Sequence, residues 1–280
     1  LCTSFCPDGR EAAKIILDSR ATIKAFYDLD TPVTLKTVNA EGTVPYLPAD
    51  GLGAFDLVLS YTGGRALVEL RTLLGARRVA PLYGSVDPQA HCQVAPLPDF
   101  HSDLCYLGTY SSDRQAALEE LFVRPSELMS ARRFAIGGAQ YPENFPWREN
   151  IFFVRHLPPS LHSAFFCSAR ATLNITRGSM AEYGYCPSGR LFEAAGCGTP
   201  IISDWWEGLS NFFTPGVEIL RVKSAEDVHN VLSLSDKELQ AIGTAARQQV
   251  LERHTASHRV MALEDICEGV VSDWSSLAVS

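Results

Sequence analysis

The chain has 280 residues, of which 46% are hydrophobic and 20% charged, and its formal net charge is −8. This length and composition are typical of a globular protein with more than one domain. No basic run is present, so we expect no nucleic-acid partner, and no apolar stretch approaches the ~20 residues of a membrane span. The eight cysteines are scattered and form no C-x-x-C motif, which predicts reduced thiols in a cytoplasmic protein.

Short β-branched or aromatic runs alternate with helical segments along the chain. The predicted strands are 23–29, 56–61, 77–83, 103–110, 132–138, 150–157, 171–177, 199–204 and 218–222. The predicted helices are 111–123, 160–169, 188–197, 225–232 and 258–268, and a further one begins at the capping box "SDKE" (235–238). This alternation predicts an α/β fold with parallel sheets.

A proline-rich stretch without periodicity, "SVDPQAHCQVAPLPDFHS" at 85–102, divides the chain. We expect a partial N-terminal Rossmann-like domain over 1–88, a linker over 89–102, and a nucleotide-binding Rossmann-like domain with terminal helices over 103–280. The N-terminal part shows three strands in ~85 residues, fewer than a doubly wound domain usually has. The prediction is therefore a truncated N-terminal domain with a thin sheet and an open apolar edge.

The segment "PSGRLFEAAGCGTP" at 187–200 reads as an almost entirely apolar helix that carries one arginine and one glutamate. Ser188 is a good N-cap, and Arg190 and Glu193 point to one side of the helix. One interpretation is an internal ion pair, in which Arg190 and Glu193 neutralise each other. The other is a nucleotide site, because the helix N-terminus and Arg190 suit a phosphate while the carboxylate suits the two hydroxyls of a ribose.

The stretch "RLFEAAGCGTPIISDWWEGL" resembles the signature of group-1 glycosyltransferases, and most closely the CgeB-type spore-maturation glycosyltransferase-like family. Five earlier stretches occur in the order expected of a nucleotide-sugar enzyme: "RRVAPLYGSVDP", "YLGTY", "FAIGGAQYP", "FFVRHLPP" and "LNITR". The similarity extends from about Phe26 to Leu263. It implies a GT-B fold, in which two Rossmann-like domains face each other across a cleft and the C-terminal domain binds the donor.

The resemblance also implies a set of donor-binding residues. They are Gly108, Thr109, Arg155, His156, Ser188, Gly189, Arg190 and Glu193. Glu193 matches the glutamate that binds the ribose, the start of its helix matches the diphosphate side, and the loop after Arg155 matches the place where backbone groups meet the base. Arg177 ends a predicted strand on the same side and is a further candidate for the phosphates.

Two features bear on catalysis. Many group-1 enzymes carry an earlier glutamate tied to the sugar, and Tyr185 occupies that position here. Asp28 and Asp30 lie at the end of a predicted strand, and three interpretations stay open for them: a base for the acceptor, a D-x-D metal site, or turn capping. We take the acceptor base as the catalytic hypothesis for both aspartates.

The sequence therefore predicts a metal-independent glycosyltransferase that uses a nucleotide-diphosphate sugar and needs no cofactor. Its acceptor would be a glycan, a protein or a small molecule. Two alternatives are a nucleotide-sugar epimerase on the same fold and a non-catalytic nucleotide-sugar-binding protein of a spore coat or scaffold.

Overall fold

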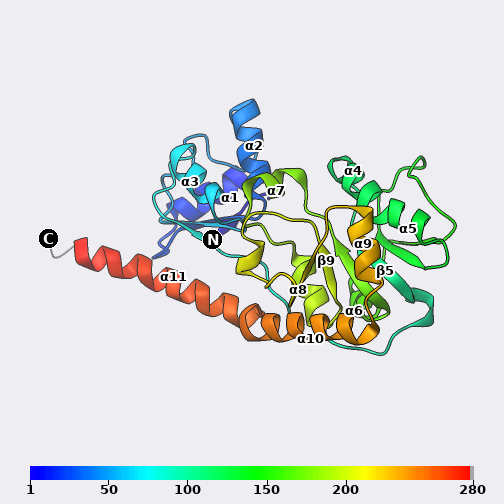
Figure 1. The fold of residues 1–280 in the computed structure, drawn as a ribbon. Helices are drawn as coiled ribbons and strands as arrows, with labels where there is room; N and C mark the ends of the chain where they lie inside the picture. Colours follow the sequence, from blue (N-terminus) through cyan, green and yellow to red (C-terminus); the bar gives the residue numbers. More distant parts are fainter. Residues whose placement is uncertain (278–280) are drawn as a thin grey trace. The chain divides into compact units, whose positions relative to one another are not determined.

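The computed structural model describes residues 1–277, with side chains up to Ser272. The chain forms two compact units (Figure 1). Unit 1 consists of Leu1–Gly84, Ser179–Pro187 and the residues from Ser257 onward, and unit 2 consists of Ser85–Gly178 and Ser188–Ala256. The first segment of unit 1 ends at Gly84, directly before the proline-rich stretch 85–102. The assignment of two later segments to unit 1 differs from the expected continuous domain over 103–280.

Unit 1 contains a four-stranded parallel sheet in the order β1-β2-β3-β4. Its strands are β1 (Cys2–Thr3), β2 (Ala25–Asp28), β3 (Leu57–Ser60) and β4 (Val79–Pro81). Its helices are α1 (Gly9–Asp18), α2 (Thr31–Glu41), α3 (Arg65–Thr72), most of α7 (Gly178–Tyr183) and α11 (Ala256–Leu277). The sequence predicts β2 to β4 but not β1, since two residues carry no pattern.

The two faces of this sheet bury different partners because side chains alternate along a strand. Phe26 and Val58 face a cluster that contains residues of α1, α2 and α3. Their neighbours on β3, Leu57 and Leu59, pack instead in a cluster with Val270 of α11. The sheet of unit 1 is thus covered on one face by the helices that connect its strands and on the other by a helix from much later in the chain.

Unit 2 contains a six-stranded sheet, also entirely parallel. Its strands are β5 (Ser102–Leu107), β6 (Phe134–Gly138), β7 (Ile151–Arg155), β8 (Ala169–Asn174), β9 (Ile201–Ser203) and β10 (Leu220–Arg221). Its helices are α4 (Gln115–Leu118), α5 (Arg124–Leu128), α6 (His162–Cys167), α8 (Gly189–Gly196), α9 (Ala225–Leu232) and α10 (Asp236–Arg253). A π-helical segment, Glu119–Val123, joins α4 to α5.

The strand order of unit 2 is β10-β9-β8-β5-β6-β7. Read along the chain, β6 and β7 extend to one side of β5, and β8, β9 and β10 then extend to the other, which is the Rossmann arrangement. The direction of winding reverses between β5 and β8. Ligands of such sheets bind outside the carboxyl ends of the strands near this reversal.

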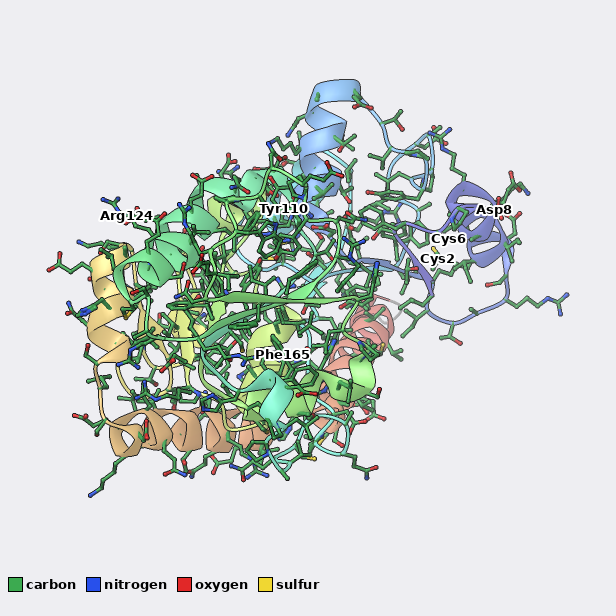
Figure 2. All side chains as sticks on the ribbon, turned by 90° about the vertical axis from the view of Figure 1, so that its right-hand side faces the viewer. Cys2, Cys6, Asp8, Tyr110, Arg124 and Phe165 are labelled. Carbon is green, nitrogen blue, oxygen red and sulfur yellow. The ribbon has the colours of Figure 1, made fainter. Side chains whose placement is uncertain are left out.

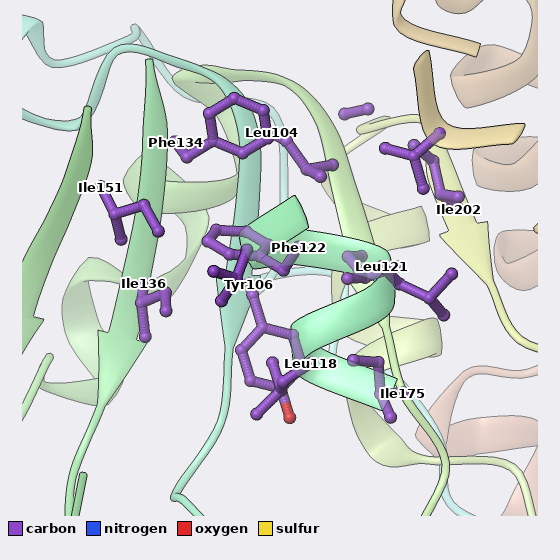
Figure 3. Packing of buried hydrophobic residues seen from close by; sticks show 14 of the residues in the cluster. Leu104, Tyr106, Leu118, Leu121, Phe122, Phe134, Ile136, Ile151, Ile175 and Ile202 are labelled. Carbon is purple, nitrogen blue, oxygen red and sulfur yellow. The ribbon is translucent and has the colours of Figure 1, made fainter. Parts of the chain in front are cut away.

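Aromatic and aliphatic side chains fill the core of unit 2 (Figure 3). Phe122, in the π-helical segment, packs edge-on against Phe134 of β6 with ring centroids 5.5 Å apart, and Leu104 and Tyr106 of β5 join the same cluster. Phe165 of α6, labelled in Figure 2, is fully buried and packs edge-on against Phe100. The core therefore fixes β5 and β6, whose carboxyl ends carry two glycine turns.

The expected capping box is confirmed, because Ser235 accepts from the Glu238 amide and the Glu238 side chain accepts from the Ser235 amide. In residues 1–277, no helix has both the length and the apolarity that crossing a membrane requires.

Candidate donor nucleotide site

A cavity of about 360 Å³ opens at the carboxyl ends of β5, β6 and β7 in unit 2. Its lining includes Gly108, Thr109, Gly138, Ala139, His156, Leu157, His162, Arg190 and Glu193. Five of the residues that the sequence singles out for donor binding thus meet in one cavity: Gly108, Thr109, His156, Arg190 and Glu193. Its volume is within the range of small-molecule sites.

Two glycine turns form one wall of this cavity. The Gly108 amide donates to the Gly137 carbonyl at 2.9 Å, and Gly138 has a φ of +157°. A Cβ on Gly138 would collide with the carbonyl oxygen of Gly108, so the two backbones can approach only because the side chain is absent. The His156 amide then donates to the Gly138 carbonyl at 2.7 Å. This network holds the ends of β5, β6 and β7 together.

Two guanidinium groups supply positive charge beside the Gly108 turn. The buried Arg114 donates from Nη2 to the Thr109 carbonyl at 2.5 Å, which ties the turn to the helix that follows. In the described part of the chain, Arg190 forms no hydrogen bond or ion pair. Burial and the nearby Arg114 charge lower the pKa of Arg190, although a guanidinium stays protonated. Two neighbouring cations without a carboxylate bonded to either favour an anionic ligand.

A buried hydroxyl lies next to the same turn. Tyr106 of β5 is fully buried, and its phenol oxygen has no hydrogen-bond partner within residues 1–277. A Cβ built on Gly108 would lie 2.9 Å from that oxygen, which places the hydroxyl directly beside the turn. Leaving a buried polar group unsatisfied costs about 1–3 kcal/mol, so such a group in a native fold calls for an explanation, and an anion at the turn supplies one.

Glu193 lies on the second turn of α8 and is contacted by two imidazoles. Its Oε2 atom is 3.8 Å from Nε2 of His91 and 3.7 Å from Nδ1 of His162. Burial acts to raise the pKa of Glu193, but His162, His91 and Arg190 together outweigh burial and lower it. Glu193 is therefore an ionised acceptor at the edge of the cavity.

Close packing around α8 fixes the position of the Glu193 carboxylate. Leu191 and Phe192 are buried, and Gly196 lies so close to the His91 carbonyl that a Cβ there would be 2.8 Å from the oxygen. Gly198, with φ of +73°, ends the helix as the sequence predicts. Ser188 is the N-cap residue, but its side chain makes no capping hydrogen bond, so the first amides of α8 are not capped by it.

The remaining donor-site candidates lie elsewhere. Ser188 and Gly189 begin α8 without lining the cavity, and Arg155 ends β7 with an exposed side chain. Arg177 forms an ion pair with Asp113, Nε to Oδ2 at 3.5 Å. Asp113 thus partly neutralises the charge of Arg177.

The two catalytic candidates lie at the end of β2 in unit 1. Asp28 is fully buried and accepts hydrogen bonds from the Thr34 hydroxyl at 3.0 Å and the Asp30 amide at 3.3 Å. Burial raises the pKa of Asp28 to about 6. Asp30 occupies the N-cap position of α2. These contacts resemble a turn network, while a carboxyl with a pKa near neutrality is also what a general base requires.

Tyr185, which stands where many group-1 enzymes have a glutamate, adopts a left-handed backbone with φ of +46°. Its carbonyl accepts from the Gly63 amide at 3.0 Å, and its ring covers Gly64. Close approach by Tyr185 therefore explains why two glycines follow β3 in "YTGG".

Five residues of the cavity region that carry the argument were not singled out from the sequence: Gly138, Tyr106, Arg114, His162 and His91. A glycine at the end of a predicted strand was a usable signal for Gly138. No local signal marks the others: His91 and His162 meet Glu193 only in the folded chain, Tyr106 lies within an ordinary buried strand, and Arg114 acts through the Thr109 carbonyl and the nearby Arg190.

A family model described as "Glycosyl transferase-like" matches residues 114–265, more than half of the chain. No curated protein matches the sequence. Among solved structures, a sucrose-phosphate synthase from Thermosynechococcus elongatus is 12% identical with a TM-score of 0.62, and the alignment covers 89% of this chain and 74% of that one.

Two further structures show the same likeness. A TarM variant from S. aureus, solved with fondaparinux, α-GlcNAc-glycerol and UDP, is 9% identical with a TM-score of 0.62. That alignment covers 92% of this chain and 54% of TarM, so this chain spans about half of TarM. HepE of Anabaena, solved with UDP and glucose, is 11% identical with a TM-score of 0.58 over 89% of this chain and 72% of HepE.

The parallel sheets, the strand order of unit 2 and these structural matches define the fold class as that of the GT-B glycosyltransferases. The chain belongs to the glycosyl transferase-like family.

Proposed function

We propose that this protein transfers a sugar from a nucleotide-diphosphate donor, bound at the cavity of unit 2, to an acceptor whose class we leave open among glycans, proteins and small molecules. The observation that carries the proposal is the convergence of the Gly108 turn, the unpaired Arg190 and the ionised Glu193 at the carboxyl ends of the strands. A nucleotide presents a matching pair of groups, an anionic diphosphate and a ribose with two vicinal hydroxyls.

In this proposal the diphosphate lies against the Gly108 turn. Arg190 and Arg114 supply the positive charge, and the buried Tyr106 hydroxyl supplies a further donor. These groups would stabilise the charge that develops on the departing nucleotide, because preorganised donors in a partly dry site need no rearrangement during the reaction. We propose that they do so without a metal ion or any other cofactor.

Glu193 would accept hydrogen bonds from the ribose hydroxyls. Its lowered pKa keeps it ionised, and a charged acceptor strengthens such bonds to about 1.5–3 kcal/mol each. The loop at Arg155 and His156 would meet the base, as the family resemblance implies. UDP is the first nucleotide to test, since TarM and HepE were solved with it.

Three finer points concern the subfamily, the acceptor base and the second candidate function. "EAAGCGTPIISDWWEGL" supports a CgeB-type subfamily, and with it a role in spore maturation. Asp28, with its raised pKa, is the stronger of the two candidates for an acceptor base. Tyr185, in the place of a sugar-binding glutamate, favours the second candidate function, a nucleotide-sugar-binding protein that does not catalyse transfer.

The test begins with calorimetric titration of nucleoside diphosphates into the 280-residue chain. We expect one nucleotide to bind and Arg190→Gln to weaken its binding at least tenfold. Arg124→Gln, at an exposed residue of α5, should leave the affinity unchanged. Equal affinity in the wild type and Arg190→Gln would contradict the proposed site.

Activity is measured separately with a panel of nucleotide sugars. Release of the nucleotide with formation of a glycoside supports transfer, and isomerisation of the donor supports the epimerase. Tight binding with neither reaction would support the non-catalytic alternative.

A further inference from the structure

Three metal-binding side chains from separate elements meet at the edge of the cavity. They are His91 in the stretch before β5, His162 at the start of α6 and Glu193 in α8. One ligand atom from each lies within 4.8 Å of the others, and Oε2 of Glu193 lies 3.8 Å from His91 and 3.7 Å from His162. In the part of the chain that the structure describes, no other three-ligand group of this kind is found.

The segment that carries His91 is fixed to its surroundings. The His91 amide donates to the Asp87 carbonyl at 2.8 Å, and the Ser163 hydroxyl donates to the Ala90 carbonyl at 2.8 Å, which ties the segment to α6. The Cys167 thiol contacts the Cys92 carbonyl at 3.7 Å. The two imidazoles and the carboxylate are therefore held together before any ion arrives.

We propose that His91 Nε2, His162 Nδ1 and Glu193 Oε2 bind a divalent transition-metal ion of the zinc class. Two imidazoles and one carboxylate are a ligand set that zinc accepts with an open fourth position. Ligand atoms around tetrahedral zinc lie about 3.3 Å apart, so the distances of 3.8 Å and 3.7 Å from the two imidazole nitrogens to Glu193 Oε2 need only a small contraction. The side chains are 18%, 19% and 25% exposed, which leaves an entry path while excluding most water.

Magnesium and calcium do not suit this site. Both ions prefer oxygen ligands, and two of the three ligand atoms here are nitrogen. Zinc is a suitable ion because imidazole nitrogen and carboxylate oxygen are both among its ordinary ligands.

Two features make the site moderate in affinity. Nδ1 of His91 is buried and has no hydrogen-bond partner within residues 1–277, so this ligand lacks the supporting acceptor that strengthens many zinc sites about 10–100-fold. The Arg190 guanidinium acts on the Glu193 carboxylate and therefore also repels a cation bound there. We expect a dissociation constant in the micromolar range.

The metal and the donor would exclude each other. This part of the inference rests on the proposed function, because it requires that Glu193 binds the ribose. A carboxylate bonded to zinc cannot accept from the ribose hydroxyls at full strength. Zinc would therefore act as an inhibitor of donor binding at this site and not as a cofactor.

The experiment titrates Zn²⁺ alone into metal-free 280-residue chain by calorimetry. We expect one zinc per chain, binding at least tenfold weaker in His91→Gln and in His162→Gln. His229→Gln, an exposed histidine on α9, is the control and keeps the wild-type affinity. Arg190→Gln should bind zinc more tightly, because the repelling charge is removed, although the same substitution weakens nucleotide binding.

Cobalt substitution separates this site from the eight cysteines. The proposal requires a cobalt spectrum without a thiolate charge-transfer band. Absence of zinc binding, wild-type zinc affinity in both His91→Gln and His162→Gln, or a strong thiolate band would each overturn it.

The donor test is kept apart from the metal test. Zinc inhibition is measured against each variant's own metal-free activity or nucleotide affinity, and it should be lost in His91→Gln. If zinc binds as described and nucleotide does not, the proposed function fails while the metal site stands. If nucleotide binds and zinc does not, the metal site fails while the proposed function stands.

Discussion

The Oε2 atom of Glu193 lies 3.7 Å from Nδ1 of His162. The two residues belong to α8 and α6, and the contact helps to keep the carboxylate ionised although most of it is buried. A carboxylate held charged in this way is a stronger acceptor for hydroxyl groups than a neutral acid.

Glu193→Ala should weaken nucleotide binding at least about tenfold, a step of about 1.4 kcal/mol, because the variant loses charge-assisted hydrogen bonds to the ribose. Calorimetric titration of UDP measures the effect. Glu226→Ala, which removes an exposed acidic side chain from α9, is the matched control and should keep the wild-type affinity. An unchanged affinity in folded Glu193→Ala would rule out the ribose role.

Chelation should leave sugar transfer undiminished. Arg190, Arg114 and the Tyr106 hydroxyl supply the stabilisation that a metal ion provides in other enzymes. The measurement compares initial rates with and without EDTA. Loss of activity on chelation, with recovery on adding manganese, would contradict this prediction and direct attention to Asp28 and Asp30 as ligands.

Asp28→Asn should raise the free energy of unfolding at pH above 6, by up to about 3 kcal/mol. Burial raises the pKa of Asp28 from 3.8 to about 6, so the folded state binds this proton more tightly than the unfolded state does. The stability from Asp28 is thus fully present below pH 3.8 and is lost as the pH rises through about 6. Denaturant unfolding of the wild type and Asp28→Asn at about pH 4.5 and about pH 8, below and above this pKa, measures the difference in their free energies of unfolding.

The advantage of Asp28→Asn should shrink as the pH falls through 6. The asparagine oxygen can still accept from Thr34, so the local network remains. A constant difference between the two proteins at all pH values would show that Asp28 has an ordinary pKa.

Gly64→Ala should lower the free energy of unfolding by about 1–3 kcal/mol. Gly64 has φ of +55° and ψ of −132°, a conformation that residues with a Cβ avoid, and the new methyl group would press on the Tyr185 ring. Gly269→Ala is the contrast, since Gly269 lies within α11 with open space around it. That variant should gain about 0.5–1 kcal/mol. Equal effects in thermal unfolding would refute the backbone explanation.

The strands were readable from the sequence because each is a short apolar run between turn residues. All the predicted strands from 23–29 to 218–222 correspond to β2 through β10. The strand β1 was missed because Cys2 and Thr3 join the sheet only by pairing with Phe26 and Tyr27, which is a non-local event.

The candidate site was partly predictable for the same reason. Gly108, Arg190 and Glu193 lie at strand ends or helix starts, where residue type and position together carry information. His91 could not be found in this way, because it reaches Glu193 only after a proline-rich stretch folds back onto α6 and α8. Arg177 forms an ion pair with a distant aspartate, Asp113, and this contact could not be inferred from its position at a strand end.

Helix α11 covers one face of the unit 1 sheet, although nearly all of unit 2 separates it from β4 in the chain. During synthesis, the strands β2 and β3 leave the ribosome long before Val270 can pack on Leu57 and Leu59. Domains generally fold in the order in which they are made. The β3 face formed by Leu57 and Leu59 therefore lacks its α11 partner until the residues of unit 2 have been made, and we expect this face to be apolar and open to water during that interval.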